Sequence, residues 1–162
     1  MNKQANSRRA FLGKTTAAGA AIVAVGGSAA VASAATASAG RRVTRGDPSA
    51  PFSRAVEFNG VVFVAGVVGR KPNRGEIASA DFEPQCRQAL ENLKASVEAA
   101  GSTMDKVMKC TCFLTDVRDF PTMNKLFVEF FPTDPPARST VVVTELVVAG
   151  AKLEIDCATC LV

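Results

Sequence analysis

The residues that could carry chemistry include five cysteines, and the sequence has no histidine, tyrosine or tryptophan. Without histidine there is no Ser-His-Asp triad, no Cys-His pair and no imidazole ligand for a metal. Acid-base chemistry would therefore fall to carboxylates, lysine, cysteine or ordered water. Four of the cysteines form two closely spaced pairs, Cys110-Thr-Cys112 and Cys157-Ala-Thr-Cys160, which raises the question of a four-thiolate metal site.

The surroundings of these cysteines argue against a metal. Both pairs lie in strongly apolar, strand-like stretches, whereas zinc-binding pairs usually lie on knuckles or tight turns. In a strand, Cys157 and Cys160 would point to opposite faces of the sheet. We therefore expect buried free thiols and no metal or cofactor. A thiol-based metal or redox protein remains the alternative.

The formal charge of +4 belongs to the N-terminal segment. Residues 1–39 contain four basic side chains and no acidic one, and the remaining 15 basic residues are balanced by all 15 acidic residues. Binding to phosphate chains needs a concentrated positive surface. The neutral body of the chain therefore argues against nucleic acid as a partner.

Residues 1–39 have the features of an export signal. Ser7-Arg8-Arg9-Ala-Phe-Leu-Gly-Lys14 closely resembles the twin-arginine consensus, and residues 15–40 carry no charge. Most of this run is Ala, Gly, Ser and Thr, which gain little from lipid, and small-residue cleavage sites end at Ala34 and Ala39. We expect a partnership with the twin-arginine translocase, cleavage that leaves no stable membrane anchor, and a periplasmic or extracellular location. The alternative is a basic, disordered N-terminus in the cytoplasm.

The rest of the chain is divided into a flexible connector, residues 40–50, and one domain, residues 51–162. Apolar, strand-like runs predict strands at 55–58, 61–68, 107–115, 138–146 and 151–161, and Asn59-Gly60 between the first two is a strong hairpin signal. Apolar residues at steps of three and four predict helices at 81–100 and 119–130. The order β-β-α-β-α-β-β predicts an α+β fold with two helices on one face of a single sheet.

The second face of that sheet also requires a cover. Residues 61–68 and 141–143 are apolar at consecutive positions, whereas a sheet with one solvated face shows alternate polar residues. No further chain is left to cover it, so we expect other copies of the subunit to do so. A strongly twisted, partly exposed sheet is the simpler explanation.

Several segments together resemble one family. Pro136-Ala-Arg138-Ser-Thr140-Val and Lys152-Leu-Glu154-Ile are similar to the C-terminal signature of the Rid/YjgF family, the reactive-intermediate (imine/enamine) deaminases. The similarity continues through residues 116–124 and 87–101 and reaches Pro51-Phe52. It implies a homotrimer with a chorismate-mutase-like fold and ligand clefts between subunits. It also implies hydrolysis of 2-imino acids to 2-oxo acids and ammonia, with no cofactor or metal.

The resemblance also implies roles for single residues. Arg138 matches the arginine that binds the substrate carboxylate, and Glu154 matches the glutamate that positions water. Thr140 matches a position whose backbone often lines the site, and Asn124 matches a frequent asparagine that fixes local structure or the subunit contact. Local sequence alone would place Arg138 on the surface or in an ion pair, and Glu154 on a solvated strand face with its charged neighbours.

Two positions depart from the family pattern. Phe52 stands where active imine deaminases usually carry Tyr, and Ala65 of the Ala65-Gly66 pair stands where they carry Ser. Each change removes a hydroxyl from the substrate-binding set and keeps its shape. Loss of two hydrogen bonds would lower the rate by one or more decades or shift the substrate range toward bulkier or more apolar acids. The alternative function is therefore a non-catalytic trimer that binds small carboxylates through Arg138.

Overall fold

The structure is a computed structural model that describes residues 40–72 and 75–162. The predicted export signal, residues 1–39, lies outside the described residues. The described elements are the strands β1 (Arg42–Thr44), β2 (Ala55–Phe58), β3 (Val61–Val68), β4 (Val107–Leu114), β5 (Ala137–Val142) and β6 (Leu153–Cys160), the helices α1 (Phe82–Ala99) and α2 (Phe120–Phe130), and the short 3-10 turns Met104–Lys106 and Val117–Asp119.

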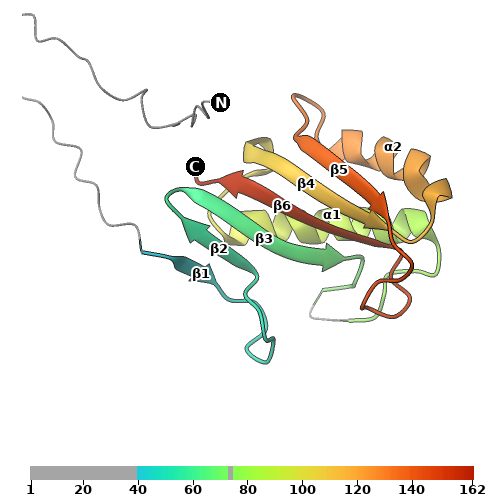
Figure 1. The fold of residues 1–162 in the computed structure, drawn as a ribbon, viewed down its shortest axis with the longest axis horizontal. Coiled ribbons are helices and arrows are strands. Elements are labelled where there is room, and N and C mark those ends of the chain that lie inside the picture. The colour runs from blue at the N-terminus through green and yellow to red at the C-terminus, as the bar shows by residue number, and fades with distance from the viewer. Residues whose placement is uncertain (1–39, 73–74) are drawn as a thin grey trace, which may run out of the picture. The chain divides into compact units, whose positions relative to one another are not determined.

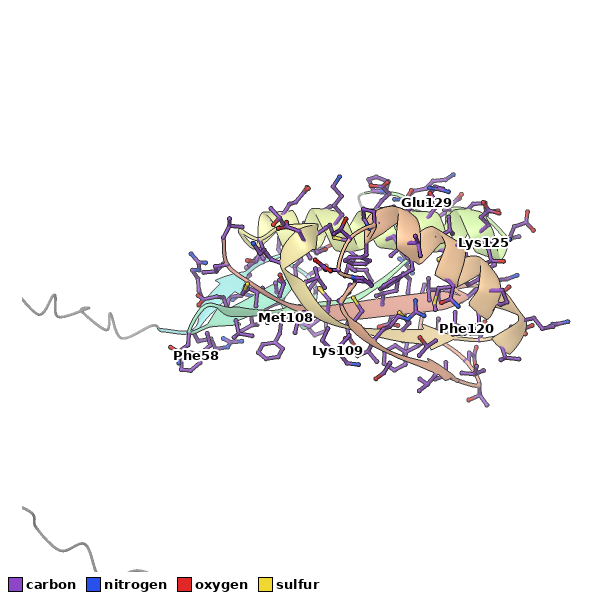
Figure 2. All side chains as sticks on the ribbon, turned by 90° about the horizontal axis from the view of Figure 1, so that it is seen from above. Phe58, Met108, Lys109, Phe120, Lys125 and Glu129 are labelled. Atoms are coloured by element: carbon purple, nitrogen blue, oxygen red, sulfur yellow. The ribbon has the colours of Figure 1, made fainter. Side chains whose placement is uncertain are left out.

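All six strands form one sheet in the order β1-β2-β3-β6-β4-β5. The β4–β5 pair is parallel and the other pairs are antiparallel. Both helices cover the same face of this sheet (Figures 1 and 2). The predicted α+β fold, a single sheet with two helices on one face, is confirmed. None of the helices in the described part of the chain has the length and apolarity needed to cross a membrane.

The structure adds a strand that the sequence analysis missed. The connector predicted over residues 40–50 contains β1, whose Arg42 and Thr44 pair with Glu57 and Ala55 of β2. That prediction was wrong for residues 42–44, because β2 offers a free edge whose backbone groups any extended segment can complete. An ion pair of 3.3 Å between Arg42 Nε and Glu57 Oε2 accompanies the pairing.

The last two strands are shorter than predicted. β5 ends at Val142 and β6 begins at Leu153, whereas the sequence predicted strands at 138–146 and 151–161. Both Val142 and Leu153 pair with Leu114, the last residue of β4. Beyond this point the Val143 N–H still donates to the Leu114 carbonyl and the Thr115 N–H to the Lys152 carbonyl. Regular pairing ends there because β4 itself ends at Leu114.

The hairpin between β2 and β3 forms at the predicted place. Asn59 and Gly60 both have positive φ, 52° and 81°, the backbone that a two-residue turn needs to match the twist of its strands. The Gly60 N–H also donates to Glu57 Oε1 at 2.8 Å. The local sequence therefore fixes the register of β2 against β3.

The core lies between the sheet and α1. The predicted apolar stripe of this helix is buried against β3 and β6, and includes Phe82, Cys86, Ala89, Leu90, Leu93 and Val97. Facing it, the residues of β6 alternate strictly between buried and half-buried. Leu153, Ile155 and Cys157 point into the core, so Glu154 and Asp156 point to the other face.

We call this other side of the sheet the open face. Within one chain nothing described covers it, and its large apolar side chains are exposed: Phe58 is 52% exposed, Phe63 60% and Val141 45%. Figure 2 shows Phe58 and Lys109 on the side of the sheet away from both helices. A stripe of polar groups, Lys109, Thr111, Asp156 and Glu154, crosses the same face.

One buried amide fastens α1 to the end of the sheet. The Gln85 side chain is fully buried and donates to the carbonyls of Ser79 and Gly150 at 2.7 and 2.9 Å. Its Oε1 accepts from the Lys152 N–H at 2.9 Å, directly before β6 begins. Gln85 thus sets the start of the strand that carries Glu154.

We predict that Gln85→Leu lowers the free energy of unfolding by about 2–4 kcal/mol, because three backbone groups lose the hydrogen bonds that the buried amide makes to them. Urea denaturation measures this. The matched control is Glu91→Leu, on the exposed side of the same helix, which should change the free energy by less than about 0.5 kcal/mol. Equal stabilities of the Gln85→Leu variant and the parent chain would contradict the prediction.

Candidate functional site

Arg138 lies on the edge strand β5 and is held beneath α2. It pairs with Cys110 of β4, whose side chain is buried in the core, so the guanidinium points to the helix side of the sheet. Its Nη2 donates to Asn124 Oδ1 at 2.5 Å. Its Cζ lies 4.5 Å from the Phe127 ring centroid and 5.7 Å from that of Phe120, the geometry of a cation–π contact.

These contacts position the guanidinium without neutralising it. Within the described residues no carboxylate pairs with Arg138, and its hydrogen-bond acceptor there is the neutral amide of Asn124. The aromatic ring of Phe127 restricts the side chain further, which spares part of the rotamer entropy that binding would otherwise cost. Such an arginine is suited to two parallel hydrogen bonds with an external carboxylate.

Thr140 and Asn124 belong to the same cluster as Arg138. Thr140 follows Arg138 by two residues on β5, is half-buried, and pairs with Cys112. Asn124 reaches the guanidinium from α2. The sequence analysis predicted the helix over 119–130 that carries Phe127, and it did not connect this residue with Arg138. That link depends on how α2 packs on β5.

Glu154 lies on the open face, between Val68 of β3 and Phe113 of β4. Its carboxylate rests on Gly66, where an added Cβ would lie only 2.1 Å from Glu154 Oε1. Glycine is therefore required at position 66 for the glutamate to occupy this place. Burial raises the pKa of Glu154, and the nearby charge of Asp156 raises it further.

A pocket of about 380 Å³ opens next to Gly66, between α1, the second half of β3 and the loop before β2. The predicted substrate-binding residues Phe52, Ala65 and Gly66 all line it. Phe52 is 61% exposed, so one side of its ring is free for another group to cover. The structure thus brings these three residues together beside Glu154, although Glu154 does not itself line the pocket.

The two clusters lie apart within one chain. Arg138 is on the helix side of the sheet and Glu154 on the open face. Along β6 the position opposite Arg138 is Cys157, three residues from Glu154, and β4 lies between β5 and β6. Strand spacings place the two Cα atoms on the order of 14 Å apart. A single chain therefore does not bring Arg138 and Glu154 onto one small substrate.

The cysteines do not form a site of their own. All five are free thiols. Cys86, Cys110, Cys112 and Cys157 are buried, and Cys160 is half-buried. The expectation of buried free thiols is therefore met by the strand cysteines that face the core. Burial raises the pKa of Cys112 to about 11 and that of Cys157 to about 12, so neither forms a thiolate readily. Among the described residues no group of three or more Cys, Asp or Glu side chains is placed to hold a metal.

Comparison with known proteins identifies relatives of the whole domain. The family profile described as Endoribonuclease L-PSP matches residues 43–160. Reactive Intermediate Deaminase A, chloroplastic, from Arabidopsis thaliana is 39% identical over 107 residues, which are 66% of this chain and 57% of that protein. The 2-iminobutanoate/2-iminopropanoate deaminase of Dermatophagoides farinae is 38% identical over 109 residues, 67% of this chain and 84% of that protein.

Solved structures agree with the fold. A crystal structure of YyfA from Yersinia pestis, a protein of the Rid family, has a TM-score of 0.70 and is 35% identical, over 75% of this chain and all of that one. The assignment of roles to Arg138, Glu154, Asn124, Thr140, Phe52, Ala65 and Gly66 stays a prediction.

We predict that the raised pKa of Glu154 makes its charge unfavourable in the folded chain. Above the ordinary pKa of 4.5 the unfolded state gains more from ionisation, so Glu154→Gln should increase the free energy of unfolding at pH 7. This gain should disappear as the pH falls below about 4.5, where both states are protonated. Denaturation of the variant and the parent chain at pH 4 and pH 7 measures the difference.

Asp156→Asn is the matched control that tests what raises the pKa of Glu154. It should move the carboxyl NMR titration of Glu154 to lower pH, because the second source of the raised pKa is gone. A Glu154 that titrates below 4.5 in the parent chain would contradict the assignment.

Proposed function

The chain belongs to the Endoribonuclease L-PSP family, which includes the Rid (YjgF) proteins, and on that premise we propose that it hydrolyses 2-imino acids to 2-oxo acids and ammonia. The observation that carries the proposal is the guanidinium of Arg138, which is held in place and left without a carboxylate partner in the described residues. Relatives that bear the names of imine deaminases support it.

The reaction needs little beyond positioning. Arg138 binds the carboxylate of the 2-imino acid, which leaves the electrophilic imine carbon next to a water. Glu154 accepts a proton as this water attacks and passes it to the nitrogen, which gives a carbinolamine. The carbinol O–H proton then moves through the same carboxyl to the amino group, the C–N bond breaks, and ammonia leaves as the carbon becomes the 2-oxo group. A carboxyl with a raised pKa is suited to both transfers near neutral pH. No histidine, metal or cofactor enters this scheme.

The site requires a second copy of the chain. Because Arg138 and Glu154 point to opposite faces, a substrate can touch both only if they come from neighbouring subunits. We propose the homotrimer that is typical of the family, in which the exposed Phe58, Phe63 and Val141 of the open face are covered by other copies. Arg138 of one subunit then faces Gly66 and Glu154 of its neighbour.

Two other functions receive less support. The family description names an endoribonuclease, but outside residues 1–39 the 15 basic and 15 acidic residues cancel, which does not favour binding to an RNA backbone. A non-catalytic carboxylate-binding trimer is favoured by Phe52 and Ala65, which offer no hydroxyl to the substrate. Such a binding protein would use Arg138 in the same way as the proposed enzyme, but it would not turn over the substrate.

Arg138→Ala should lower kcat/KM for ammonia release at least about a hundredfold, because the substrate carboxylate loses two charge-assisted hydrogen bonds. The assay uses 2-iminobutanoate made in situ by an amino-acid oxidase. Arg138→Lys should restore only a small part of the rate, since an ammonium cannot form the paired geometry. The matched control is Arg87→Lys, at an exposed arginine paired with Glu129, which should leave the rate unchanged.

Mixing two inactive variants tests whether the site is shared. Arg138→Ala keeps Glu154, and Glu154→Gln keeps Arg138, so randomly mixed trimers should contain intact interfaces and recover about one quarter of the parent activity. If trimers that contain both variants recover no activity, the shared site is contradicted. Binding of 2-oxobutanoate without any turnover by the parent chain would favour the carboxylate-binding function instead.

We further propose that residues 1–39 direct export through the twin-arginine pathway, with the mature protein in the periplasm or outside the cell. The support is the Arg8-Arg9 motif and the uncharged run that follows it. Arg8→Lys with Arg9→Lys keeps the charge and should leave the protein in the cytoplasmic fraction at its full length. Fractionation and mass measurement of the N-terminus check this, and export of the double variant at the parent level would contradict the proposal.

A further inference from the structure

The pocket beside Gly66 is lined by more positive charge than the proposed reaction uses. Arg54, Arg70 and Lys71 all line it, and the acidic residue among its lining residues is Asp47. These three cations lie on the segments that enclose the pocket, and none of them belongs to the cluster of Arg138. The local balance therefore favours an anion, although the domain as a whole is neutral.

Arg70 has a side-chain donor without an acceptor among the described residues. Its Nε is buried and lacks a hydrogen-bond partner, and it is the one such side-chain atom in the described ranges 40–72 and 75–162. A buried donor of a charged group without an acceptor costs free energy, and native structures rarely leave one unexplained. An acidic group of a ligand in the pocket would supply the missing acceptor.

The backbone that carries Arg70 is held rigidly. Asn92 Nδ2 donates to the carbonyls of Val68 and Arg70 at 2.9 and 2.8 Å. Gly69 lies so close to α1 that an added Cβ would be 2.2 Å from the Gln85 carbonyl oxygen. The wall of the pocket is therefore fixed before any ligand binds, as a selective binding site requires.

The rest of the pocket suits a carbon chain. Val67, Val68 and Ala95 contribute to its wall, and its volume of about 380 Å³ exceeds what an acid of three or four carbons needs. Gly66 joins the pocket to the proposed reaction centre, because its backbone lines the pocket and the Glu154 carboxylate rests against it.

Resting on the proposed imine hydrolysis, we propose that this pocket selects 2-imino acids whose side chain ends in a second carboxylate, which Arg70 and Lys71 bind while Arg54 closes the rim. The substrate then spans two arginine sites, with its first carboxylate on Arg138 of the neighbouring subunit and its second in the pocket. Such a substrate is bulkier than the acids of three or four carbons, in line with the sequence analysis, but it is acidic and not more apolar.

The first experiment compares two imines of equal length. 2-Iminoglutarate and 2-iminopentanoate are made in situ from glutamate and norvaline by amino-acid oxidases, and kcat/KM is measured for each. We expect the dicarboxylate to be preferred at least about tenfold, the contribution of one charged hydrogen bond. In Arg70→Gln and in Lys71→Gln this ratio should fall by about tenfold. Lys94→Gln, which removes an exposed charge of α1 outside the pocket, should keep the parent ratio.

The second experiment separates this inference from the proposed function. Calorimetry compares the binding of 2-oxoglutarate and 2-oxopentanoate to the parent chain and to the variants Arg70→Gln, Lys71→Gln and Lys94→Gln. If neither imine is turned over but 2-oxoglutarate binds more tightly and loses this advantage in Arg70→Gln, the proposed function fails and the acidic-ligand pocket stands. If 2-iminopentanoate is turned over as fast as 2-iminoglutarate and both oxo acids bind equally, the pocket inference is overturned and the imine hydrolysis stands. Should Arg70→Gln not fold, Lys71→Gln and Arg54→Gln decide the same question.

Discussion

The alternation of side chains along β6 is the constraint on which the site depends. This strand lies between β3 and β4, so Leu153, Ile155 and Cys157 must enter the core beneath α1. Glu154 is then forced onto the open face, against the one residue of β3 that has no side chain to exclude it. The same register turns Arg138 toward α2. The packing of one core thus separates the two groups that the proposed reaction must combine.

This separation gives the exposed apolar face a chemical consequence. Phe58, Phe63 and Val141 would in any case favour association, because large exposed apolar side chains gain free energy from burial. In the proposed trimer the same association supplies each Glu154 with the guanidinium that its own chain directs elsewhere. Catalysis would then require the oligomer. A monomer would keep its fold and have two incomplete half-sites.

In the proposed reaction, the distribution of charge around the pocket would also limit the choice of substrate. Phe52 and Ala65 offer no hydroxyl, so in the proposed reaction the polar contacts to a small imino acid would be fewer than the family pattern provides. Arg70, whose buried Nε lacks a partner among the described residues, and Lys71 also line this pocket. Binding free energy lost near the reacting carbon can be replaced at a distance from it, provided the substrate reaches that far. A second carboxylate is the group that these side chains would bind.

Sequence alone determined the elements whose signals are local. The stripe of α1, the turn at Asn59-Gly60 and the α+β order follow from residues close together in the chain, and the structure confirms them. Strand β1 escaped prediction because it forms by pairing with the edge of β2, which residues 42–44 do not reveal by themselves. The sequence also did not reveal the contact of Phe127 with Arg138, nor that Arg54, Arg70 and Lys71 line one pocket. Which face a side chain occupies, and what lies beside it, depends on pairing between segments distant in sequence, so only the tertiary structure could decide it.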